Sequence, residues 1–124
     1  MNGKLIDTNI LIYLSQRKIN LEDITQMHSR LYISVITYME ALGYPFRNNQ
    51  EKQTMEKICS IFEIIQLEQT IIDEVIRIRQ KHKIKLPDAI ILGTAISGKL
   101  ELITANTADF INIHPGVPLH NPMK

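Results

Sequence analysis

Two kinds of hydrophobic pattern alternate along this chain, and each predicts a different element of secondary structure. Short uninterrupted apolar runs predict buried strands, whereas apolar residues spaced three or four positions apart predict helices with one face in the core. The runs place strands at residues 3–6, 31–34, 63–67 and 100–103, with a fifth suggested at 111–113. The wider spacing places helices at residues 8–16, 21–29, 35–42, 50–61, 69–82 and 86–97, and a helical turn at 106–110. Strands that alternate with helices in this way indicate an α/β fold, with a parallel sheet covered by helices on both faces.

Glycine and proline mark the ends of several of these elements. The helix over 35–42 should end at Gly43, and the one over 86–97 at Gly98, because glycine often follows a last helical turn. Residues 114–122 contain three prolines and one glycine. We therefore expect this tail to wrap over the surface without forming an element of its own.

The composition is that of an ordinary single domain. A chain of 124 residues is long enough for one hydrophobic core, so we treat residues 1–124 as one domain. The net charge of +1 gives no bulk attraction for nucleic acid or membranes, although a local basic patch would suffice for RNA. A single cysteine, Cys59, excludes an intramolecular disulfide framework and a cysteine zinc site.

Neither a membrane span nor a secretion signal is visible in the sequence. No stretch is apolar for long enough to cross a membrane, and the first apolar run meets Asp7 too soon to form the core of a signal peptide. We therefore expect a cytoplasmic protein without a membrane partner.

Acidic side chains with apolar neighbours in sequence stand apart from the others, which lie in mixed polar runs. They are Asp7, Glu40, Asp88 and Asp109. Asp7 comes directly after the strand over 3–6, and Glu40 lies on the helix that follows the second strand. Asp88 and Asp109 lie at the starts of helical segments. Carboxylates are rarely buried unless they are paired or bound to a metal, so these positions require an explanation.

Each acid also has a simple structural explanation when it is taken alone. Asp7 suits the N-cap of the helix that follows it, where such a residue stabilises a helix by about 1 kcal/mol. Asp88 would complement the positive end of its helix, and Asn106 with Asp109 has the spacing of a capping box. Glu40 would merely flank the apolar stripe of its helix. Local stabilisation would therefore account for any one of the four.

The acids become informative as a set. In a parallel sheet the ends of the strands and the starts of the following helices share one edge, so these carboxylates should lie near each other. Clustered carboxylates repel each other, raise each other's pKa values and destabilise a fold unless a cation binds between them. Ligation by oxygen alone selects Mg²⁺ or Mn²⁺ over zinc.

The order of these motifs resembles that of the PIN-domain ribonucleases. The residues that carry the resemblance are Asp7-Thr8-Asn9, Ser34-Val35-Ile36-Thr37-Tyr38-Met39-Glu40, Leu86-Pro87-Asp88-Ala89 and Thr104-Ala105-Asn106-Thr107-Ala108-Asp109-Phe110. Each motif is weak alone, but together they span essentially the whole chain, including the tail from Gly116 to Pro122. Within the family, the chain is most similar to the VapC-like toxins of bacterial and archaeal toxin–antitoxin pairs.

The resemblance implies a three-layer α/β/α fold around a parallel sheet of about five strands. It also implies an endoribonuclease that depends on Mg²⁺ or Mn²⁺, with metal binding and catalysis by Asp7, Glu40, Asp88 and Asp109. Water activated by the metal would attack the phosphodiester, so no protein nucleophile is needed. The partners implied are an RNA substrate, a cognate antitoxin and a second copy of the chain in a homodimer.

Hydroxyl and amide residues near the acids are candidates for holding the carboxylates or the substrate. They are Thr8, Asn9, Ser34, Thr37, Thr104 and Asn106. Asn106 stands where some members of the family have an acidic residue, which leaves the number of bound metal ions open. It is a candidate for orienting water or ligand.

A basic run leads directly to Asp88. It contributes Arg77, Arg79, Lys81, Lys83 and Lys85. These side chains are candidates for contacts with RNA phosphates, which would make binding weaken with salt. They would equally suit the C-terminal end of the helix over 69–82, where each positive charge is favourable by about 0.3–1 kcal/mol.

Several aromatic side chains are candidates for stacking on bases or for packing on a partner. They are Tyr13, Tyr38, Tyr44 and Phe46. We expect at least two of them to belong to the core or to a dimer contact.

Two other functions compete with a nuclease. A PIN module could bind RNA or protein without catalysis, although the intact set of acids argues against this. An Mg²⁺-dependent phosphatase or receiver-like domain would use an aspartate as phosphate acceptor, with a further acidic cluster or a lysine nearby. Here Asp7 is followed by Thr8-Asn9 and not by a second aspartate, which weakens that option.

Overall fold

The computed structural model describes residues 3–24 and 29–123, which form one parallel sheet with helices around it. The strands are β1 (Gly3–Ile6), β2 (Arg30–Ser34), β3 (Glu63–Ile65), β4 (Glu101–Ile103) and β5 (Leu119–His120). The helices are α1 (Thr8–Ser15), the 3₁₀ helix η1 (Leu21–Asp23), α2 (Val35–Leu42), α3 (Asn49–Cys59), α4 (Gln69–Lys81), α5 (Leu86–Gly98) and α6 (Thr107–Ile113). Within these ranges, no helix has both the length and the hydrophobicity of a membrane span.

The strand order is β3-β2-β1-β4-β5, so β1 lies at the centre of the sheet. The chain first adds β2 and β3 on one side of β1 and then crosses back to place β4 on the other side, where Ile6 pairs with Ile103. Open α/β sheets bind ligands at such a switch point, beyond the carboxyl ends of the strands. Here that point lies between Asp7 and Thr104, the residues that follow β1 and β4.

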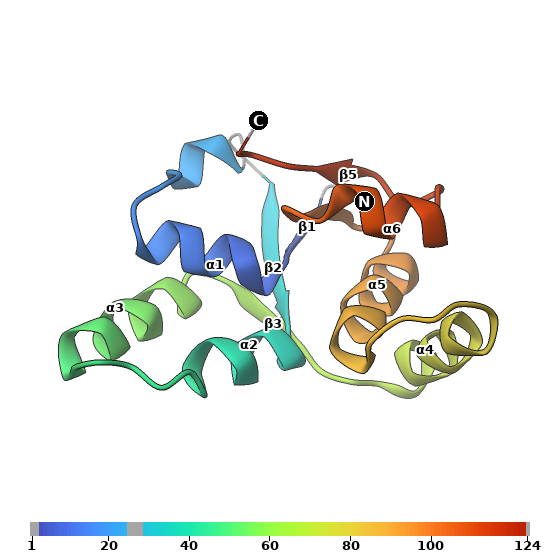
Figure 1. Cartoon of the computed structure of the whole chain (residues 1–124), viewed down its shortest axis with the longest axis horizontal. Helices are drawn as coiled ribbons and strands as arrows, with labels where there is room; N and C mark the ends of the chain where they lie inside the picture. Colours follow the sequence, from blue (N-terminus) through green and yellow to red (C-terminus); the bar gives the residue numbers. More distant parts are fainter. Residues whose placement is uncertain (1–2, 25–28, 124) are drawn as a thin grey trace.

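Alternate residues of the strands pack into separate cores, one on each face of the sheet. Ile6, Ile33 and Ile103 join the core beneath α1 and α3, whereas Leu5 and Leu102 join the core beneath α4, α5 and α6. This follows from the strand backbone, which points successive side chains to opposite faces. Figure 1 shows the result, with α1 and α3 on one side of the strands and α4, α5 and α6 on the other. The expected three-layer α/β/α fold is confirmed.

Polar side chains start the helices at the edge of the sheet. Asp7 accepts a hydrogen bond from the Thr8 backbone N–H at the start of α1. Ser34 Oγ accepts one from the Ile36 N–H, 3.2 Å away, at the start of α2. Pro87 lies in the first turn of α5, as expected. Strands β1 and β2 therefore each turn directly into a helix at the same edge.

The two predicted helix ends at glycine have different outcomes. Helix α2 ends at Gly43, as predicted. Helix α5 continues through Gly98 and ends at Lys99, which adopts the left-handed conformation with a φ of 53°. Glycine usually takes this position because it has no Cβ to clash. The prediction of Gly98 as the residue after the helix was therefore one position too early.

The C-terminal region differs from the prediction in two ways. Residues 111–113, expected as a fifth strand, instead complete helix α6. The fifth strand is Leu119–His120, within the tail expected to form no element. It bonds to the end of β4, where the Thr104 N–H donates to the His120 carbonyl at 3.0 Å. A strand of two residues between prolines carries too little pattern to be predicted, and proline is tolerated there because the strand is at an edge.

The helix expected over residues 21–29 is only the short η1 in its described part. The Asn20 N–H donates to the Asp23 carboxylate at 2.8 Å and closes this turn. Residues 25–28 lie outside the described part of the chain. Other predicted ends are shifted slightly, since β3 stops at Ile65 and α3 at Cys59.

Candidate active site

Asp7 lies at the carboxyl end of the central strand and is almost completely buried, with 4% of its surface exposed. Its Oδ2 accepts a hydrogen bond of 2.7 Å from the Thr104 hydroxyl and one of 3.4 Å from the Asn9 amide. Its Oδ1 accepts one of 2.8 Å from the Thr8 N–H. Burial raises the pKa of this carboxyl above its usual value of 3.8, while the bonds from Thr104 and Thr8 oppose the rise. The carboxylate is thus fixed in place by neutral donors and has no cationic partner among them.

Negative neighbours add to the raised pKa of Asp7, since both Asp88 and Glu40 repel its ionised form. Asp88 lies half-buried in the first turn of α5. Burial raises the pKa of Asp88 as well, Lys85 opposes that rise, and Asp109 on α6 adds to it. The four predicted acids are therefore linked electrostatically, Asp7 to Glu40 and Asp88, and Asp88 to Asp109.

Helix α2 crosses the carboxyl edge of the sheet and carries Glu40 toward α1. Ala41 packs in the core beneath α1 and α3, whereas Ile36 packs against residues of α4 and α5, so the helix contacts both cores. The Thr8 hydroxyl lies 2.7 Å from Glu40 Oε1 and 3.1 Å from the hydroxyl of buried Thr37. Because a hydroxyl has one hydrogen, Thr8 donates it to the carboxylate and accepts from Thr37. These contacts hold the Glu40 carboxylate at the start of α1.

The turn after β4 fixes the end of β1. Asn9 Oδ1 accepts a hydrogen bond of 3.3 Å from the Ala105 N–H, and Thr104 Oγ1 accepts one of 3.0 Å from the Asn106 N–H. Asn9 and Thr104 also both donate to Asp7. They therefore position this carboxylate relative to the turn that leads into α6.

Of the predicted supporting residues, Ser34 caps a helix and Asn106 does not. Ser34 caps α2 through the Ile36 N–H. Asn106 precedes α6, but its side chain makes no capping hydrogen bond, so the capping-box explanation for Asn106 and Asp109 is wrong. The explanation of Asp7 as a helix cap is correct, and it is compatible with a ligand role because an ionised carboxylate can accept several bonds.

The donor set suits a hard cation, because all four acids offer only oxygen. Among residues 3–24 and 29–123, no three histidine, cysteine, aspartate or glutamate side chains are gathered closely enough to hold a metal ion by themselves. Mg²⁺ typically keeps several waters and uses one or two carboxylates together with a substrate phosphate, so this looser arrangement fits it. A cation would also reverse the raised pKa values of Asp7 and Asp88.

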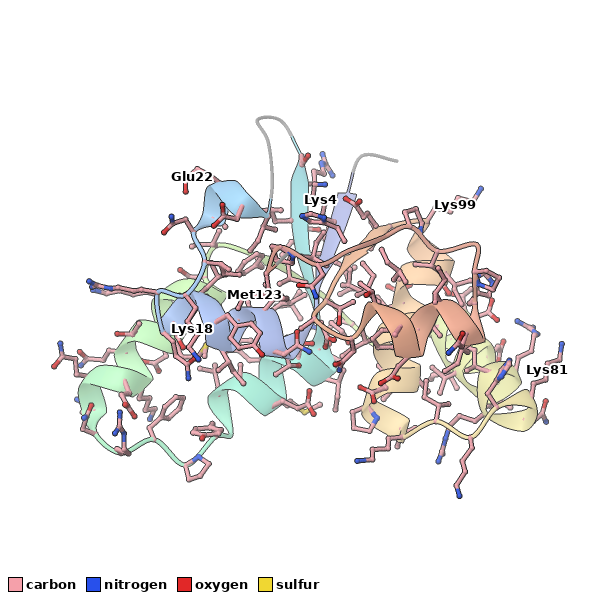
Figure 2. All side chains as sticks on the ribbon, turned by 45° about the horizontal axis from the view of Figure 1, so that its top comes forward. Lys4, Lys18, Glu22, Lys81, Lys99 and Met123 are labelled. Carbon is pink, nitrogen blue, oxygen red and sulfur yellow. The ribbon has the colours of Figure 1, made fainter. Side chains whose placement is uncertain are left out.

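Two arginines of the predicted basic run already have partners within the chain. Arg77 pairs with Glu74 at 2.7 Å, and Arg79 Nε donates to the Ile84 carbonyl at 3.3 Å. Arg79 and Lys81 lie in the last turn of the helix, where positive charge is favourable. Figure 2 shows Lys81 pointing outward at the far end of α4, away from the sheet.

The rest of the basic run follows α4 and leads to the helix that carries Asp88. Lys83 and Lys85 are exposed in the connection between α4 and α5. Lys85 is close enough to Asp88 to oppose the rise in its pKa. Of the predicted cations, Lys85 is therefore the one that acts on an acid of the site.

Sequence reasoning missed two further features around the acids. The Asn121 amide donates to the Ala105 carbonyl at 3.5 Å, so the tail supports the turn that holds Asp7. A hollow of about 500 Å³ lies beside Glu40, bordered by α1, α2 and α3. Both features depend on contacts between distant segments, which leave no periodic signal in the sequence.

Comparisons with known proteins agree with this geometry. The family model "PIN domain" matches residues 4–114 of the chain. A solved toxin–antitoxin complex from Klebsiella pneumoniae contains a chain 39% identical to this one, with a TM-score of 0.75 over 96% of this chain and 97% of the other. VapBC2 from Rickettsia felis, bound to a promoter DNA fragment, gives 21% identity and a TM-score of 0.83 over 96% and 98% of the two chains. DNA-bound VapBC from Salmonella typhimurium gives 23% identity and a TM-score of 0.81 over 98% of this chain and 99% of the other. No curated protein matches the chain.

The matched range contains every residue of the predicted acidic set, namely Asp7, Glu40, Asp88 and Asp109. The solved neighbours come from toxin–antitoxin complexes, in agreement with the resemblance to VapC-like toxins. Those below 25% identity support the fold alone. The match to the family model covers most of the chain, and the chain belongs to the PIN-domain family.

Proposed function

We propose that this chain is a metal-dependent endoribonuclease and the toxin of a toxin–antitoxin pair. The observation that carries the proposal is the position of Asp7, a buried carboxylate at the switch point of the sheet whose ionised form is repelled by Glu40 and Asp88. A buried carboxylate without a positive partner is costly. A divalent cation would supply that partner, and nuclease activity is what the resemblance to PIN-domain ribonucleases implies.

The residues that would hold Mg²⁺ or Mn²⁺ are Asp7, Glu40, Asp88 and Asp109. When bound, the metal makes water a stronger nucleophile at neutral pH and stabilises negative charge on the phosphate. Thr8 keeps Glu40 in place, and Thr104 with Asn9 keeps Asp7 in place. Groups that are already oriented need no reorganisation during the reaction, which lowers its barrier.

The reaction is hydrolysis of one phosphodiester bond. Water forms a new bond to phosphorus and loses one proton to the solvent. The bond from phosphorus to the leaving ribose oxygen breaks, and that oxygen takes up a proton from the solvent. No protein side chain is consumed in this scheme. The single cysteine, Cys59, packs in the core beneath α1 and α3 and takes no part in it.

The connection between α4 and α5 would contact the RNA backbone. Lys83 and Lys85 are exposed immediately before the helix that carries Asp88. A phosphate held by them would direct the strand toward the acids. Lys81 and the paired Arg77 lie farther along α4 and would contribute less.

A solved relative supports the expectation of an antitoxin partner. The Klebsiella pneumoniae relative, which is 39% identical to this chain, belongs to a toxin–antitoxin complex. By similarity, we expect this chain to bind a cognate antitoxin, and the resemblance to VapC-like toxins implies a homodimer.

Substitution of Asp7 tests the nuclease assignment. Asp7→Asn keeps the side-chain shape, and asparagine is also a good N-cap, so the fold should persist. We expect cleavage of RNA by the purified chain with Mg²⁺ to fall by at least about 100-fold, the usual cost of losing one electrostatic catalytic group. Asp73→Asn, the same change at an exposed position of α4, is the matched control and should cleave normally.

Undiminished cleavage by Asp7→Asn, with metal present, would overturn the assignment of this site. RNA binding without cleavage by the unaltered chain would favour a non-catalytic PIN module. Growth arrest on expression, relieved by the neighbouring open reading frame, would separate a toxin from a housekeeping nuclease.

A further inference from the structure

The hollow of about 500 Å³ beside Glu40 has no role in the proposed function so far. Its walls come from α1, α2, α3 and the segment over residues 44–48 that joins α2 to α3. Figure 1 shows these helices grouped together beside β1 and β2. Protein pockets for small molecules typically measure roughly 300–1,000 Å³, so a nucleobase would fit. Because Glu40 belongs to both, the hollow adjoins the candidate active site directly.

Two aromatic rings form part of this hollow. The ring centroids of Tyr44 and Phe46 lie 5.9 Å apart, with a tilt of 60° between the planes. Phe46 packs against the core beneath α1 and α3, which holds it in place, whereas Tyr44 is 58% exposed. An exposed ring supported by a second ring offers a free face on which a flat group can stack. Tyr38 of α2, by contrast, is not part of the lining.

The polar groups that line the hollow suit a base better than they suit a phosphate. Arg47 is engaged by the Glu51 carboxylate through contacts of 3.0 and 2.6 Å, and the other charged group in the lining is Glu40. Hydroxyls and amides supply the remaining polar groups, including the exposed side chains of Gln16 and Gln50. Amides can hydrogen-bond the edges of an unpaired base, whereas an uncompensated carboxylate repels phosphate.

We propose that this hollow binds an unpaired base of the RNA, next to the phosphate that the acids act on. The base stacks on the free face of Tyr44, and its edge faces Gln16 and Gln50. The proposal rests on the ribonuclease function and narrows the substrate to RNA that is single-stranded beside the cut, because a paired base would first have to leave its stack. A peptide segment of a protein partner is the competing occupant. The flat aromatic face beside the candidate active site favours the base.

The test measures binding without cleavage, in the Asp7→Asn variant. Short unpaired RNAs carry a fluorescent purine analogue at a different position in each, and stacking quenches its emission. We expect quenching at one position, and we expect Tyr44→Ala to abolish it and to weaken binding about tenfold, the usual scale for losing one stacked base. Tyr44→Phe should retain both. Tyr38→Ala removes a tyrosine outside the hollow and should change neither.

Quenching that survives Tyr44→Ala, or that is the same at every position, would overturn the proposal. Unchanged RNA binding together with weaker antitoxin binding by Tyr44→Ala would also overturn it, since the hollow would then belong to the protein partner. A melting curve checks that each variant is folded, as expected for the exposed Tyr44. Gln50→Ala gives an independent measurement and should reduce discrimination between bases while quenching persists.

The base site and the nuclease assignment can fail separately. Cleavage by the unaltered chain, with quenching that is independent of Tyr44, would leave the nuclease standing without the base site. Quenching that depends on Tyr44, in a chain that does not cleave RNA with Mg²⁺ or Mn²⁺, would leave the base site standing without the nuclease.

Discussion

Asp7 and Asp88 are carboxylic acids in surroundings that disfavour their ionised forms. Burial is the main cause of the raised pKa of each, and neighbouring acids add to it. A group whose pKa is raised by folding binds protons more tightly in the folded chain than in the unfolded one. The folded state therefore loses stability as the pH rises past the usual pKa. At neutral pH, these two side chains weaken the fold in the absence of metal.

Replacement of Asp88 by asparagine should therefore stabilise the metal-free chain. In a chelating buffer at neutral pH, we expect Asp88→Asn to melt roughly 2–4 °C higher than the unaltered chain, since repulsion by Asp7 and Asp109 is removed. This gain in melting temperature should shrink as the pH falls toward 3.8, the usual pKa of this carboxyl. Asp88 of the unaltered chain then becomes protonated and loses its charge. Asp73→Asn should show no such pH dependence. A lower melting temperature for Asp88→Asn at neutral pH would contradict the repulsion.

The Thr8 hydroxyl should matter to the reaction through its bond to Glu40. Thr8→Val removes the donor that lies 2.7 Å from Glu40 Oε1 and keeps the shape of the side chain. We expect the rate of RNA cleavage to fall about 10- to 100-fold, the usual cost of losing a partner of a metal ligand. The melting temperature should fall as well, because the buried Thr37 hydroxyl loses its acceptor. Thr8→Ser retains the hydroxyl and should restore most of the rate. A rate for Thr8→Val equal to that of the unaltered chain would show that Glu40 needs no such partner.

Elements with a strong pattern of their own could be predicted from the sequence. Helix α5 was recognisable because its residues are apolar nearly all round, and they are indeed buried from Ala89 to Ala95. Strand β1 was recognisable as a short apolar run that ends at Asp7. Since parallel strands end at one edge, the neighbourhood of the acids followed from these two patterns and from the position of Glu40.

Elements and contacts that depend on distant partners could not be predicted. Strand β5 exists only because β4 offers an open edge to a short segment of the tail. The hydrogen bonds that join Thr8 to Glu40 and Thr37, and the hollow beside them, depend on how α2 crosses the edge of the sheet. No local pattern encodes that crossing, because it is set by packing against both cores.

The connection between α4 and α5 should control the salt dependence of RNA binding. We expect Lys83→Gln and Lys85→Gln each to weaken binding to the Asp7→Asn variant, and each to reduce the slope of log affinity against log salt by about 1. Lys57→Gln changes an exposed lysine of α3 and should leave the slope unchanged. Titrations at several salt concentrations measure the slope. An unaltered slope for both loop variants would limit these lysines to stabilising the end of α4.

The candidate site joins parts of the whole molecule that no single layer could supply. Asp7 precedes α1, Glu40 lies on α2, Asp88 on α5 and Asp109 on α6. Helices α1 and α5 belong to opposite layers of the fold (Figure 1). A cation held by these groups would link the layers, and it would bind the folded chain in preference to the unfolded one. Metal binding and global stability should therefore be coupled.

Added Mg²⁺ or Mn²⁺ should raise the melting temperature of the unaltered chain. At a metal concentration about 100 times the Kd, the expected gain in the free energy of unfolding is about 2.7 kcal/mol. Asp7→Asn should lose most of this gain, whereas Asp73→Asn should keep it. Thermal melts at increasing metal concentration measure the effect. Equal shifts in both variants would place the bound metal away from Asp7.

The central place of β1 has a consequence for how the chain is made. A ribosome releases Asp7 early, but Thr104, which bonds to it, comes 97 positions later. Strands β1 and β2 can pair soon after synthesis, while the other edge of β1 stays open until β4 has been added. A nascent chain therefore holds an unfinished site until Thr104 has been made. We therefore expect that whatever chemistry the site performs starts only after β4 has joined the sheet.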